Sequence, residues 1–64
     1  MGHYTRDVKR LLAEYGYSFS RYGKGDHEVW VNDVTKESVS VDGKIILRSS
    51  ANKTLGKAGV KERL

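Results

Sequence analysis

The hydrophobic residues of this chain change their spacing at Gly16, and this change constrains the fold more than any other feature. Before Gly16, apolar side chains recur with the i, i+3, i+4, i+7 spacing of an amphipathic helix, at Val8, Leu11, Leu12 and Tyr15. Thr5 is the expected N-cap of this helix, and Gly16 is the expected C-terminal stop. After Gly16 the alternation has a period of two, which is typical of β-strands. The chain therefore combines a helix with a sheet.

Three short segments of alternating character predict three strands. The first covers residues 17–22, with Tyr17, Phe19 and Arg21 on one face and Ser18, Ser20 and Tyr22 on the other. The second covers residues 27–31, with His27, Val29 and Val31 on one face and Glu28 and Trp30 on the other. The third covers residues 38–41. Because residues 23–26 and 32–36 are rich in turn formers, we expect an antiparallel meander.

A second, shorter helix is expected near the end of the sequence. Ser49 or Ser50 is its expected N-cap, Ala51, Leu55 and Ala58 line one side, and Gly59 ends it. Periodicity does not decide whether residues 44–47 extend the sheet or form a buried connection. The predicted order is α-β-β-β-α. We expect a two-layer α+β fold in which both helices cover one face of a three-stranded antiparallel sheet.

The length of 64 residues indicates one domain, spanning residues 1–64, with a single small core. The chain has no cysteine, so disulfides do not stabilise it, and a reducing compartment suits it. The first residues, MGHYTRDVKR, lack the apolar stretch of a signal peptide, and the sequence has no run of 18 apolar residues. We therefore expect a cytoplasmic protein without a membrane partner.

The charge of +4 is unevenly distributed along the chain. Residues 1–25 have a balance of +3, residues 26–42 a balance of −4, and residues 43–64 a balance of +5. One interpretation is ordinary solvated surface charge. The other is a nucleic-acid-binding face made from the two basic ends, with a separate acidic surface in the middle of the chain.

The segment RYGKGDHEVW, residues 21–30, contains the main candidate for chemistry. Backbone N–H groups of a glycine-rich turn bind anions, Lys24 adds a positive charge, and the His27 imidazole is a group that can accept or donate a proton. These groups suit the binding of a phosphodiester and the transfer of a proton. The alternative is a glycine-rich hairpin turn followed by a histidine at the end of a strand.

Other kinds of catalytic site find less support. Asp26, His27 and Glu28 are adjacent, but neighbouring strand residues point to opposite faces and do not close on one metal ion. We therefore expect no metal, and we also expect no cofactor and no small-molecule ligand. No cysteine and no serine in a GxSxG setting provides a nucleophile. Trp30 is either an exposed stacking surface or, as is more common for a tryptophan between two valines, packed in the protein. Tyr15, Tyr17 and Tyr22 are expected in the core or at its rim.

Three sequence blocks, TRDVKRLLAEYGY, RYGKGDHEVW and RSSANKTLGKAGV, resemble the HicA family of type II toxins. The resemblance runs from Thr5 to Val60, in the same order and with similar gaps. It implies a double-stranded-RNA-binding-domain-like fold and a ribosome-independent mRNA interferase that a HicB antitoxin holds inactive. The catalytic histidine of the family's G-[ST]-H motif corresponds to His27. The hydroxyl residue of that motif is Asp26 here, and its carboxylate would repel a phosphate.

This resemblance implies that RNA is cleaved by its own 2′-hydroxyl group, with His27 as general base or acid and without a metal. Lys24 and the amides of Gly23 and Gly25 would stabilise the developing charge. Further RNA-backbone contacts are expected from Arg21, Arg48 and Lys53.

Two other functions fit the same sequence. One is a non-catalytic RNA-binding module of the same topology, although such modules concentrate lysines at the start of the second helix, where this chain reads SSANK. The other is a protein-interaction domain whose charges only keep it soluble.

Overall fold

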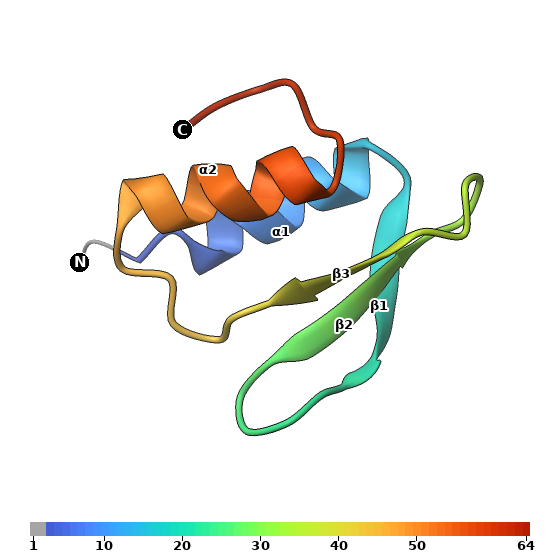
Figure 1. Ribbon diagram of the computed structural model, residues 1–64, viewed down its shortest axis with the longest axis horizontal. Helices are drawn as coiled ribbons and strands as arrows, with labels where there is room; N and C mark the ends of the chain where they lie inside the picture. Colours follow the sequence, from blue (N-terminus) through green and yellow to red (C-terminus); the bar gives the residue numbers. More distant parts are fainter. Residues whose placement is uncertain (1–2) are drawn as a thin grey trace.

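The computed structural model describes residues 3–64, and its elements follow the predicted α-β-β-β-α order. Helix α1 covers Thr5–Glu14, strand β1 Tyr17–Tyr22, strand β2 Glu28–Asn32, strand β3 Ser38–Val41 and helix α2 Arg48–Lys57. The strands form one antiparallel sheet in the order β1-β2-β3. Both helices lie on the same side of this sheet (Figure 1), which confirms the predicted α+β architecture.

The core lies between the helices and the sheet. Its apolar side chains come from α1, strands β1 and β3, the connection before α2, and α2 with the segment behind it: Val8, Leu11, Leu12, Tyr17, Val39, Val41, Ile45, Ala51, Leu55, Ala58 and Val60. Trp30 is partly buried against this cluster. The Tyr17 hydroxyl donates a hydrogen bond of 2.9 Å to the Ala58 carbonyl and so joins β1 to the end of α2. Burial, followed by the nearby Glu37 carboxylate, raises the pKa of Tyr17.

Strand β2 presents a charged residue, rather than its valines, to the helices. Glu28 and Trp30 lie opposite Val41 and Val39, whose side chains are buried in the core. Val29 and Val31 therefore lie on the open face of the sheet, because strand residues alternate between faces. The carboxylate of Glu28 is compensated on the covered face by Lys9 at 3.0 Å and by the Trp30 indole N–H at 2.9 Å.

Strand β1 departs from the predicted alternation at Ser20. Phe19 lies opposite Trp30, but Arg21 lies opposite Val29, so Ser20 has no partner and forms a β-bulge. After the bulge the two faces are exchanged. Tyr22 returns to the face that carries Phe19, and the prediction that Arg21 shares this face is wrong.

The predicted helix starts are wrong in both cases. Tyr4 is the residue before α1, and the hydroxyl of Thr5 instead accepts the Ile45 N–H at 2.9 Å. Helix α2 begins at Arg48, after Leu47, so Ser49 and Ser50 lie inside its first turn. Neither helix has a side-chain cap.

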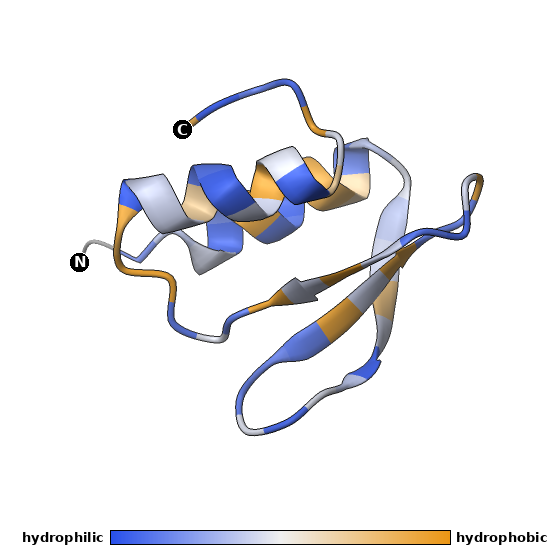
Figure 2. Cartoon of the chain, viewed as in Figure 1, coloured by the Kyte–Doolittle hydropathy of each residue, from blue (hydrophilic) through white to orange (hydrophobic). Residues whose placement is uncertain are grey.

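The segment between β3 and α2 is a connection and not a strand. Ile45 is buried, whereas Ile46 and Leu47 are exposed, and Figure 2 shows the end of this connection as a hydrophobic stretch leading into α2. Each of the two helices has ten residues, and about 20 apolar residues are needed to cross a bilayer. Within residues 3–64, no helix is therefore long and apolar enough for a membrane span.

Candidate functional site

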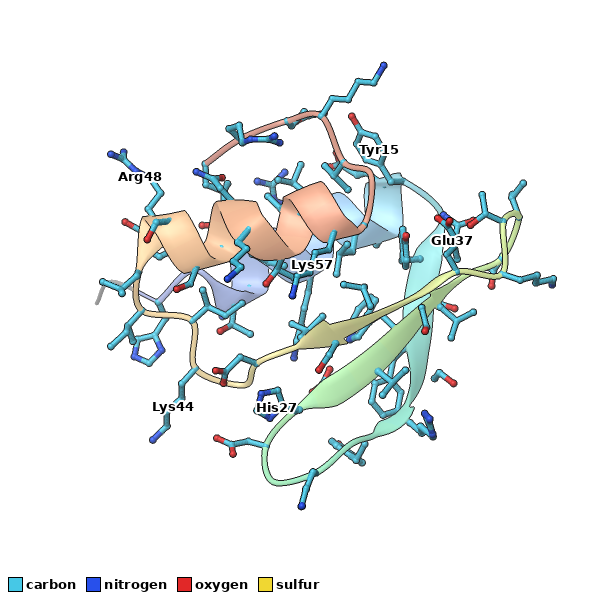
Figure 3. All side chains as sticks on the ribbon, in the orientation of Figure 1. Tyr15, His27, Glu37, Lys44, Arg48 and Lys57 are labelled. Carbon is cyan, nitrogen blue, oxygen red and sulfur yellow. The ribbon has the colours of Figure 1, made fainter. Side chains whose placement is uncertain are left out.

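A cleft of about 470 Å³ lies between α2, the outer side of β3 and the connection that joins them. Three lysines, three hydroxyl residues, one carboxylate, one histidine and an apolar stretch line it: Lys44, Lys53, Lys57, Ser40, Ser50, Thr54, Asp42, His27 and residues 45–47. Figure 3 shows His27, Lys44 and Lys57 around this space, whereas Arg48 points away from it at the start of α2.

Helix α2 supplies one stripe of the cleft. Ser50, Lys53, Thr54 and Lys57 have the i, i+3, i+4, i+7 spacing that places side chains on one side of a helix. The opposite side of α2 is anchored in the core by Ala51 and Leu55. Packing of the apolar side therefore turns the polar stripe toward the cleft.

The lysines of the cleft are free of carboxylate partners. Within residues 3–64, the ion pairs are Lys9 on α1 with Glu28 on β2, and Arg10 with Asp7 and Glu14 within α1. Asp42 is the acidic residue of the cleft, and its Oδ1 accepts the Lys44 backbone N–H at 2.9 Å. The cleft thus carries an excess of positive charge, which suits a phosphate group.

His27 lies at the hairpin end of the cleft and its side chain is exposed. Its Nδ1 atom is 3.1 Å from the carbonyl oxygen of Lys24. A carbonyl only accepts hydrogen bonds, so this contact places the proton of the neutral ring on Nδ1. The lone pair of Nε2 is then available to accept a proton, as a general base requires.

The loop before His27 is folded back on itself. The Gly23 N–H donates to the His27 carbonyl at 2.8 Å, and the His27 N–H donates to the Lys24 carbonyl at 3.3 Å. Gly25 has a φ of 65°, a left-handed conformation that glycine adopts without strain. These contacts present the imidazole at the tip of the β1–β2 hairpin.

The structure brings two of the predicted site residues together, His27 and Lys53. Arg21, Gly23, Lys24 and Gly25 are exposed on the hairpin but do not line the cleft. Arg48 is exposed at the start of α2, also outside the lining.

Sequence reasoning missed Lys44, Lys57 and the hydroxyl residues of the cleft. The polar stripe of α2 was a readable signal for Lys57, because it repeats at helical spacing opposite the apolar side. No local pattern indicates that Lys44 lies near His27, since the connection that carries it has no regular structure.

The predicted acidic surface of residues 26–42 is divided. Glu28 is paired beneath the helices, and its hydrogen bond from Trp30, followed by that from Lys9, holds the pKa of its carboxyl below its usual value despite burial. Glu37 lies at the opposite end of the sheet from His27 (Figure 3). Asp42 lies in the cleft itself.

The described residues contain no cluster of side chains that could hold a metal ion. Within the described part of the chain, residues 3–64, no three His, Asp or Glu side chains converge on a common point. Comparisons with protein-family models, with curated proteins and with solved structures give no match to this chain. The resemblance to the HicA family thus remains a prediction carried by the three sequence blocks.

Proposed function

We propose that this protein is a metal-independent endoribonuclease of the HicA type, which cleaves mRNA and thereby inhibits translation and growth. The observation that carries the proposal is the exposed His27 imidazole at the rim of a cleft with three lysines, none of which has an ion-pair partner in the described part of the chain. An RNA phosphate in this cleft would have cationic groups on the α2 side and a proton acceptor on the hairpin side.

The chemistry needs few groups because RNA supplies the nucleophile. His27 Nε2 removes the proton of the 2′-hydroxyl group, and the 2′-oxygen attacks the adjacent phosphorus. The bond from phosphorus to the 5′-oxygen then breaks and the 5′-oxygen takes a proton from water, which leaves a 2′,3′-cyclic phosphate and a 5′-hydroxyl end. Lys53 and Lys57 stabilise the negative charge that builds on the phosphate oxygens in the transition state.

We further propose a HicB-type antitoxin as the protein partner, following the same resemblance. Asp33 and Glu37 are exposed near the β2–β3 turn, away from His27, and offer a basic partner a site outside the cleft.

The test is incubation of the purified full chain with a long single-stranded RNA, with and without EDTA. We expect cleavage in both samples, and products that end in a 2′,3′-cyclic phosphate. Loss of cleavage with EDTA would indicate metal chemistry instead. Binding of the RNA without any cleavage would indicate the alternative function, a non-catalytic RNA-binding module.

A further inference from the structure

Three aromatic side chains form a cluster on the β1–β2 hairpin, and two of them, Phe19 and Tyr22, are exposed. The ring centroids of Phe19 and Tyr22 are 5.0 Å apart, and those of Phe19 and Trp30 are 6.5 Å apart. The rings meet edge to face, with interplanar angles of 64° and 81°. They are therefore not stacked face to face on one another.

The β-bulge at Ser20 creates this cluster. Without it, Tyr22 would point to the opposite face of the sheet from Phe19. The hairpin end of β1 and β2 lies away from both helices (Figure 1). Phe19 is 44% exposed and Tyr22 is 73% exposed. The expectation that Tyr22 lies in the core or at its rim is therefore wrong.

Trp30 fixes the position of the aromatic cluster. The Trp30 indole N–H donates to Glu28, and Trp30 packs against the core, so its ring is fixed. Phe19 packs edge to face against the Trp30 ring. An exposed aromatic surface on a rigid base loses little conformational entropy when a ligand binds to it.

Positive charge accompanies the rings. In the segment FSRYGK, Lys24 follows Tyr22 in the hairpin turn and Arg21 precedes it on the opposite face of the sheet, and both cations are exposed. Neither has an ion-pair partner among residues 3–64. Aromatic rings interleaved with cations are the arrangement with which proteins hold single-stranded nucleic acids, since bases stack on the rings and phosphates meet the charges.

We propose that Phe19 and Tyr22 form a stacking platform for unpaired nucleobases next to the phosphate held in the cleft. This inference rests on the proposed function and adds the site that binds the bases. Tyr22 lies opposite Glu28, the residue after His27, and the Gly23 amide bonds the His27 carbonyl. The platform and the imidazole are therefore parts of the same hairpin end. An RNA strand that runs from the cleft around this end of the hairpin, past Lys24, would place its bases on the rings.

The experiment measures binding of two fluorescent 12-nucleotide RNAs, one with all its bases and one abasic, to the full chain carrying His27→Ala to prevent cleavage. Tyr22→Ala in this background should weaken binding of the base-bearing RNA about tenfold, because one stacked base contributes on the order of that factor. Binding of the abasic RNA should not change. Tyr22→Phe, which keeps the ring, should restore the affinity. Val34→Ala removes an equally exposed apolar side chain at the other end of the sheet and should have no effect.

The platform is overturned if Tyr22→Ala binds the base-bearing RNA as tightly as the His27→Ala parent. It is also overturned if the parent does not distinguish the two RNAs, or if the chain is a dimer that Tyr22→Ala converts to a monomer. The proposed function fails separately. If the parent distinguishes the RNAs through Tyr22 but the chain with His27 intact cleaves no RNA, the platform is supported and the nuclease is not.

Discussion

The backbone of Asp26 packs so closely against Gly43 that a Cβ atom at position 43 would lie 2.6 Å from the Asp26 carbonyl oxygen. This contact joins the loop that presents His27 to the connection that carries Lys44. The connection is in turn fixed to α1, because the Thr5 hydroxyl accepts the Ile45 N–H and the Tyr4 N–H donates to the Ile45 carbonyl. The close packing at Gly43 thus fixes the position of the His27 loop relative to the connection that carries Lys44.

Gly43→Ala is expected to displace the His27 loop. The new methyl group meets the backbone of Asp26 rather than a flexible side chain, so the loop or the connection must move. We expect a loss of stability of about 1 to 3 kcal/mol, measured by urea unfolding, and a lower rate of RNA cleavage. Gly56→Ala is the control, because nothing lies within 4 Å of its Cβ position. It should stabilise α2 by about 0.5 to 1 kcal/mol. Equal stability of Gly43→Ala and the wild type would refute the close contact.

Lys53→Ala and Lys57→Ala are expected to weaken RNA binding in a salt-dependent way. Each removes one cation from the cleft, so the slope of log K against log salt should become shallower by roughly 0.7 for a single strand. Fluorescence anisotropy at several salt concentrations measures this slope. Lys61→Ala makes the same change in net charge at an exposed residue outside the cleft. If Lys61→Ala has the same effect, the binding follows overall charge and not the cleft.

Glu28→Gln is expected to change how stability depends on pH. The Trp30 and Lys9 hydrogen bonds lower the pKa of Glu28 in the folded protein, so the unfolded chain binds a proton at higher pH than the folded one. The ionised carboxylate therefore stabilises the fold above the ordinary value of about 4.5, and this contribution is lost as the pH falls through the lowered value. Above pH 5 the variant should be less stable by about 1 to 2 kcal/mol.

Urea unfolding of both proteins between pH 2.5 and pH 7 measures this difference, which should shrink as the pH falls from the ordinary value of about 4.5 through the lowered pKa of Glu28. Glu14→Gln is the matched control, since the Glu14 carboxylate is in an exposed pair with Arg10, and exposed pairs contribute little. A difference between wild type and Glu28→Gln that stays constant over the whole range would contradict the assignment.

Asn32→Ala is expected to destabilise the end of the sheet opposite the cleft. The buried Asn32 side chain donates to the Tyr15 carbonyl at the end of α1 and accepts the N–H groups of Val34 and Thr35. Its removal leaves these groups without a partner, and we expect a loss of about 2 to 3 kcal/mol by urea unfolding. Ser18→Ala removes one exposed hydrogen bond of 3.4 Å and should cost less than about 0.5 kcal/mol. Similar losses for both variants would show that Asn32 has no special role.

The order of the elements was predictable from the sequence because each one has its own period. The spacing of Val8, Leu11 and Leu12 predicts α1, and the alternation of Val39 and Val41 predicts β3, and all five residues are buried. The helix starts were not predictable in the same way. The Thr5 hydroxyl bonds a segment 40 residues away, and this tertiary contact replaces the local cap.

The bulge at Ser20 and the make-up of the cleft depend on contacts that the sequence does not display. A bulge appears only when β1 is aligned with β2, so the exchange of faces at Tyr22 has no local signature. His27 was predictable as a candidate because a glycine-rich turn with a lysine precedes it in the sequence. That His27 lines the same cleft as Lys44, Lys53 and Lys57 follows from the packing of α2 against β3, because this packing brings residues together that are distant in the sequence.

The most direct test of the central claim is the rate of RNA cleavage by three proteins: the wild type, His27→Ala and His3→Ala. The chain has two histidines, and His3, which is exposed, does not line the cleft. Under single-turnover conditions, we expect His27→Ala to lower the cleavage rate constant by about 10² to 10⁴, the usual contribution of a general base, while RNA affinity stays within about threefold. His3→Ala should cleave at the wild-type rate. Cleavage by His27→Ala at the wild-type rate would contradict the account.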